Sequence, residues 1–133
     1  MFYDFSFTIP ANTLKATPYE QNIYLTYGII HRVEIGFPAG PRHMVYVAIR
    51  DGLHQVWPTN SDGAFNSDNY TIIINDFYDM AGKPLFLTLQ GWSPGTTYAH
   101  TIEFRFGILP AEVLLPEATF MQAFKQLLHR LRL

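Results

Sequence analysis

The residues of this chain best suited to bind a metal or to move protons are five scattered histidines. They are His31, His43, His54, His100 and His129, and each falls in a different segment. Metal sites usually draw two ligands from one short motif such as HExxH, and neither that motif nor an HxH pair occurs here. The sequence therefore predicts no metal site.

An oxygen-rich segment, "NSDGAFNSDN" at residues 60–69, is the best candidate for calcium. Asn60, Asp62, Asn66 and Asp68 could supply hard oxygen ligands. When the EF-hand pattern is aligned on the glycine of this segment, however, its acidic first ligand falls on Pro58, and the flanking helices are missing. An Asn/Asp-rich turn is the better interpretation.

The residues that could support catalysis are also poorly arranged. No GxSxG nucleophile motif and no glycine-rich phosphate loop occurs, and the chain has no cysteine. Glu103 and Arg105 lie two positions apart on one face of an alternating segment, which favours ion pairs with neighbouring strands over acid–base chemistry. We therefore expect a protein that is not an enzyme and that uses no cofactor.

Two tryptophans in turn-like contexts leave two interpretations open. Trp57 precedes Pro58, and Trp92 lies two residues before Pro94. If exposed together with tyrosines, they could stack on sugar rings or contact a protein partner. If buried, they close the ends of a hydrophobic core.

Most of the chain must form strands, because hydrophobic and polar residues alternate with a period of two. The alternating segments are 3–9, 22–27, 32–37, 45–50, 70–74, 85–89 and 101–108, whereas 56–69 has the composition of a long loop. Turn residues separate the segments. The pattern predicts an all-β domain over residues 1–110, an antiparallel jelly-roll-like β-sandwich of seven or eight strands.

The closing segment has helical periodicity instead, so residues 111–133 are predicted to be a linker and an amphipathic α-helix. Six large apolar side chains share an arc of roughly 120° on a helical wheel, and together they would contribute about 9 to 18 kcal/mol on burial. These six and one tryptophan form the predicted protein–protein interface: Phe120, Met121, Phe124, Leu127, Leu128, Leu131 and Trp57. The helix could pack on a neighbouring subunit, on its own sandwich or on a membrane. The few cations among its residues disfavour the membrane.

Composition narrows the partners. Of the 133 residues, 48% are hydrophobic and only 15% are charged, against about 25% in ordinary soluble domains, so part of the surface is expected to be covered by partners. A formal net charge of -2 disfavours nucleic acid. The absence of cysteine, of a signal-like N-terminus and of a long apolar run fits synthesis as a soluble protein in a reducing cytoplasm.

Three stretches, "FSFTIPANT", "HQVWPTNSDG" and "LTLQGWSPGTTYAHTIEFRFGILP", resemble in this order a group of small β-sandwich proteins encoded among the structural genes of tailed bacteriophages and prophages. The resemblance covers residues 2–110 and carries no defined functional residues. It implies a virion component, either a decoration (cement) protein on the capsid surface or a head or tail accessory protein.

Together these observations predict a non-enzymatic structural protein that forms a symmetric homo-oligomer, for example a trimer, and binds the major capsid protein or other virion proteins. The alternative is a carbohydrate-binding sandwich that uses Trp57, Trp92 and tyrosines.

Overall fold

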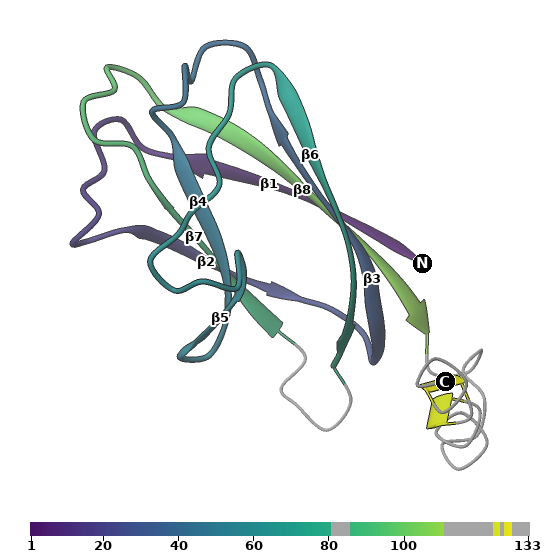
Figure 1. The fold of residues 1–133 in the computed structure, drawn as a ribbon. Coiled ribbons are helices and arrows are strands. Elements are labelled where there is room, and N and C mark those ends of the chain that lie inside the picture. The colour runs from purple at the N-terminus through teal and green to yellow at the C-terminus, as the bar shows by residue number, and fades with distance from the viewer. Residues whose placement is uncertain (81–85, 111–123, 126, 129–133) are drawn as a thin grey trace.

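The computed structural model describes residues 1–80 and 86–110, together with Phe124, Lys125, Leu127 and Leu128. Eight strands in this part form two four-stranded sheets that pack face to face (Figure 1). The strands are β1 (Phe2–Ile9), β2 (Tyr19–Tyr24), β3 (Gly28–Phe37), β4 (Tyr46–Asp51), β5 (His54–Trp57), β6 (Tyr70–Asp79), β7 (Phe86–Trp92) and β8 (His100–Pro110). The predicted all-β class and the predicted antiparallel sheets are confirmed.

Strands that are far apart in the sequence lie side by side. The first sheet has the order β1-β8-β3-β6 and the second has the order β2-β7-β4-β5, with every pair antiparallel. The pairs β1 with β8, β2 with β7, β3 with β6 and β4 with β5 are nested inside one another. The inner strands of each sheet, β8 and β3 or β7 and β4, therefore have a neighbour on both sides, and β1, β6, β2 and β5 are edges.

The alternation of β8 decides which of its side chains enter the core. The side chains at the even positions from 102 to 108 are fully buried, whereas Thr101, Glu103 and Arg105 face outward. This is the expected result for a strand with one face on the core and one in solvent.

The core lies between the two sheets and is rich in aromatic and branched side chains. The rings of Phe7 and Phe104 meet edge to face with centroids 5.8 Å apart, within the range favoured by aromatic pairs. Gly91 on β7 faces Phe7 and Ile9 so closely that an added Cβ would lie 2.5 Å from Ile9 Cδ1. The two sheets can approach at this point only because Gly91 has no side chain.

One strand was not predicted. Residues 56 and 57 were expected to begin a loop, but they close β5, where Val56 and Trp57 are buried. The Gln55 amide explains the tight turn that follows, because its Nε2 donates to the carbonyls of Pro58, Asn60 and Gly63 at 2.8, 2.9 and 3.1 Å. The Gln55 amide thus gives these three carbonyl groups the hydrogen-bond donor that the backbone of a neighbouring strand would otherwise provide.

The loop at residues 58–69 is held by its own polar groups. Asp68 Oδ1 accepts the backbone N–H groups of Gly40 and Arg42, both at 2.9 Å. These two bonds are the main reason why the pKa of Asp68 lies below its ordinary value. Val47 and Phe65 exchange two backbone hydrogen bonds of 2.9 Å. These hydrogen bonds connect the Asn/Asp-rich loop to residues 40, 42 and 47, so its polar side chains and backbone have a structural role.

The predicted C-terminal helix falls largely outside the described residues. Phe124, Lys125, Leu127 and Leu128 have helical backbone geometry, and all four are exposed. The strand β8 ends at Pro110, and the division of the chain into 1–110 and 111–133 stays a prediction.

We expect Gly91→Ala to lower the free energy of unfolding by about 1–3 kcal/mol, because the new methyl group overpacks the contact with Phe7 and Ile9. Gly36→Ala is the matched control, since the nearest atom to its Cβ would be Thr71 Oγ1 at an ordinary 3.6 Å. Urea unfolding of both variants measures the difference. Equal stability of the two variants would contradict the close approach at Gly91.

Candidate interaction surfaces

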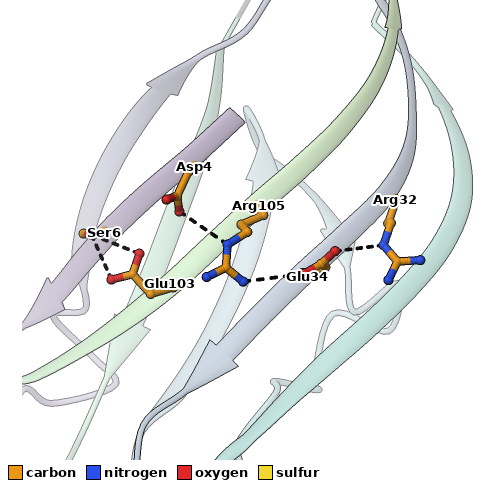
Figure 2. Close-up of polar contacts among 6 residues, drawn as sticks. All are labelled: Asp4, Ser6, Arg32, Glu34, Glu103 and Arg105. Carbon is orange, nitrogen blue, oxygen red and sulfur yellow. Dashed lines mark hydrogen bonds and ion pairs between the residues drawn. The ribbon is translucent and has the colours of Figure 1, made fainter. Parts of the chain in front are cut away.

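The outer face of the first sheet carries an ordered set of polar side chains. The strand register places Asp4, Arg105, Glu34 and Ile73 in one row across β1, β8, β3 and β6. The next row is Ser6, Glu103, Gly36 and Thr71. Figure 2 shows the charged members of these rows lying over three adjacent strands.

Charges of opposite sign alternate across this face. Arg32 Nε donates to Glu34 Oε2 at 2.8 Å, and Arg105 approaches Glu34 at 3.5 Å and Asp4 at 3.8 Å. Glu103 does not pair with Arg105; its two carboxylate oxygens accept the Ser6 hydroxyl at 2.9 and 3.0 Å (Figure 2). Arg105 therefore makes cross-strand ion pairs, as predicted, whereas Glu103 makes a cross-strand hydrogen bond instead of the predicted ion pair.

Glu34 is the centre of the network. The hydrogen bond from Arg32 lowers the pKa of Glu34 below its ordinary value, partial burial opposes this effect, and the charges of Arg32 and Arg105 lower it further. The ion-paired charges of Asp4, Glu34, Arg32 and Arg105 balance, and Glu103 adds one negative charge, so the named charges of this face favour neither strongly acidic nor strongly basic partners.

The edge strand β6 is the second feature of this side of the molecule. Its outward Ile73 is exposed, as are Tyr70 near its start and Phe77 near its end. A long strand with apolar side chains at the free edge of a sheet is a surface on which another chain can add. From sequence, "YTIII" predicted a strand but could not show that the strand lies at an edge.

Exposed apolar side chains also gather at the end of the sandwich where β8 finishes. The β2–β3 connection lies at this end (Figure 1), and the register places Phe2 opposite Gly107 and Gly28 opposite Pro110. We call the following set the apolar rim: Met1, Phe2, Tyr24, Tyr27 and Leu109. Scattered apolar residues are ordinary on protein surfaces, but a group of them at one end is typical of a contact surface.

Of the residues predicted to form the interface, the structure describes only some. Phe120, Met121 and Leu131 lie outside the described residues. Phe124, Leu127 and Leu128 are 46%, 53% and 43% exposed.

Trp57 lies in the core instead of on the surface. It is 3% exposed, and its indole N–H donates to Asp76 Oδ2 at 2.8 Å. Its side chain packs inside its own subunit, and its assignment to an interface stays a prediction. The bulk of the indole and its satisfied N–H explain why a tryptophan beside a turn belongs in the core here.

Trp92 likewise presents little surface. It is 8% exposed, with Tyr46 stacked on it at a centroid distance of 6.0 Å and Lys15 Nζ at 5.7 Å from its ring. Neither tryptophan forms an open platform for a sugar ring.

Within residues 1–80 and 86–110, no three acidic or histidine side chains lie close enough together to hold a metal ion. His43 Nδ1 lies 3.1 Å from Asn66 Oδ1 and ties two loops together. In the same part of the chain, no helix is long and apolar enough to span a membrane.

No protein-family model matches the chain, and no curated protein matches it either. Among solved structures, the SPBc2 prophage-derived protein YomS is similar over 80% of this chain and 94% of its own, with 13% identity and a TM-score of 0.43. A structure described as Bacillus endospore appendages that form a novel family of disulfide-linked pili covers 82% of this chain and 88% of its own, with 11% identity and a TM-score of 0.32. At these TM-scores neither likeness assigns the chain to a family.

We expect Glu34→Gln to lower the free energy of unfolding at neutral pH by less than about 1 kcal/mol, because the network is partly exposed. The folded-state pKa of Glu34 lies below its ordinary value of 4.5. The stabilisation is therefore present above that value and is lost as the pH falls through the folded-state pKa.

Urea unfolding of wild type and Glu34→Gln at neutral pH and at about pH 3 measures this dependence. Glu20→Gln, an exposed glutamate on β2, is the control. A loss of stability in Glu34→Gln that is the same at both pH values would argue against the network.

Proposed function

We propose that the protein is a non-enzymatic structural component of a bacteriophage particle, a decoration protein that binds the capsid surface and assembles as a homo-oligomer such as a trimer. Its sandwich is of the jelly-roll type, a view supported by the nested pairing of β1 with β8, β2 with β7, β3 with β6 and β4 with β5. The resemblance of residues 2–110 to phage structural proteins supplies the virion context.

The observation that carries the proposal is the exposure of apolar side chains in the C-terminal segment. Phe124, Leu127 and Leu128 are each more than two-fifths exposed in the single chain. Leaving such side chains in water favours association, because each contributes about 1.5–3 kcal/mol when it is fully buried. A neighbouring subunit is the surface that we propose covers them.

The rest of the surface favours the same kind of partner. Few charges are available to keep the chain apart from other proteins, and four of those on the outer face of the first sheet, Asp4, Glu34, Arg32 and Arg105, are held in ion pairs. The apolar rim, at the end of the sandwich where β8 finishes, adds further exposed apolar side chains that a neighbouring subunit could cover.

The same apolar contacts would serve at another place on the particle, as in a head or tail accessory protein. The carbohydrate-binding module based on Trp57 and Trp92 is not favoured, because both rings are buried.

We expect Phe124→Asp and Leu128→Asp to dissociate the oligomer while the sandwich stays folded, because the buried core cluster consists of residues between Phe7 and Ile108. Lys125→Glu, a charged residue of the same segment, is the matched control and should assemble as wild type does. Light scattering after size exclusion gives the mass, and circular dichroism gives the melting temperature. If the two aspartate variants melt far below wild type and keep its mass, the segment belongs to the core of its own subunit.

The virion role has its own test in purified particles from the strain that carries the gene. We expect the chain to co-purify with the particles in a ratio close to that of the major capsid protein, and the two aspartate variants to be lost from them. A few copies per particle would favour the neck or tail, and absence from the particles would reject the virion role.

A further inference from the structure

Where β3 ends and β8 begins, a groove of about 520 Å³ hollows the outer face of the first sheet. This volume lies within the range of small-molecule sites, which is roughly 300–1,000 Å³. The residues that matter for its chemistry are Gly36, Pro38, Tyr98, His100, Glu103 and Arg105.

The floor of the groove is Gly36, an interior residue of β3. It lies between Glu103 on β8 and Thr71 on β6. An added Cβ would meet Thr71 Oγ1 at 3.6 Å and Glu103 Cβ at 3.7 Å, which is ordinary contact, and the backbone has no positive φ that would require glycine. Glycine weakens a strand and often marks a place where a ligand approaches the backbone. Here its effect is to keep the groove open.

Two rings in contact, tilted by 43° to each other, form one wall. Tyr98 is 58% exposed and lies with its ring centroid 4.5 Å from that of His100. The pair also borders a second hollow of about 360 Å³, on the side of Gly40 and Met44. His100 is only 6% exposed. This wall therefore offers a ligand a mostly buried polar ring and, next to it, an exposed aromatic ring.

The charges along the groove are balanced. Glu103 supplies a carboxylate and Arg105 a guanidinium, both directed outward from β8 (Figure 2). The contacts of Arg105 with Glu34 and Asp4, at 3.5 and 3.8 Å, are longer than good hydrogen bonds and leave N–H groups available. Such a site can accept hydrogen bonds from hydroxyl groups and donate to them. It does not favour a charged ligand.

We propose that this groove binds a neutral oligosaccharide. The exposed ring of Tyr98 stacks on the apolar face of one sugar ring, and Glu103 and Arg105 bind the hydroxyl groups of the unit that lies over Gly36. The carboxylate of Glu103 would repel an acidic glycan or a nucleic acid. An aliphatic ligand would remove water from the charges of Glu103 and Arg105 without replacing its hydrogen bonds, which costs free energy. The site lies on the outer face of the sheet and does not depend on the proposed assembly.

The test begins with the full-length protein on an array of neutral and acidic glycans, followed by titration of the best neutral oligosaccharide. We expect Gly36→Thr, which fills the floor, and Tyr98→Ala, which removes the platform, each to weaken binding by about tenfold or more, corresponding to at least about 1.4 kcal/mol. Asn75→Thr, on the same outer face but outside the groove, is the matched control and should bind as wild type does. Threonine suits strands better than glycine, so Gly36→Thr should melt no lower than wild type.

The proposal is overturned if the array shows no neutral oligosaccharide bound, if acidic glycans bind most tightly, or if Gly36→Thr and Tyr98→Ala both bind as wild type does. The oligomer mass of each variant is measured alongside. A loss of binding at unchanged mass would support the groove separately from assembly, and a change in mass without loss of binding would contradict it.

Discussion

The contact between the inner faces of the two sheets is the interaction on which the rest of the structure depends. Phe104 and its neighbours on β8 meet Phe7, and Gly91 lets β7 come close enough to complete the contact. Because side chains alternate along a strand, a residue that points into this core places the next residue on the outer face of its sheet. The outward row of Asp4, Arg105 and Glu34 and the opening over Gly36 are consequences of that packing.

The core is closed between the two sheets, but other apolar side chains of the described residues remain exposed. They lie on the edge strand β6, on the apolar rim and at Leu127 and Leu128. Charge cannot compensate, since only 15% of the residues are charged. Burial of this apolar surface against other subunits would add stability, and for this reason we propose assembly as the function.

Much of the fold could be predicted from sequence because period-two alternation is a local signal. The pattern of residues 101–108 identified both the strand and its buried face, and the turn residues separated most of its neighbours. The short strand β5 was missed because its stability comes from the Gln55 amide and from burial of Val56 and Trp57, which are tertiary effects. Surfaces were harder to predict. The edge position of β6, the burial of Trp57 and the groove over Gly36 depend on which strands pair, and no single segment records this; an outward glycine within a strand was the only local sign of the groove.

The central claim is that the C-terminal segment is covered by a second subunit, and amide hydrogen exchange over residues 116–133 tests it most directly. Exchange is measured on the full chain at high concentration and again after dilution below the dissociation point. Slow exchange that becomes fast on dilution, while the strands stay protected, is the result we predict. Exchange in this segment that is equally slow at every concentration would mean that the subunit covers it alone, and would contradict the account.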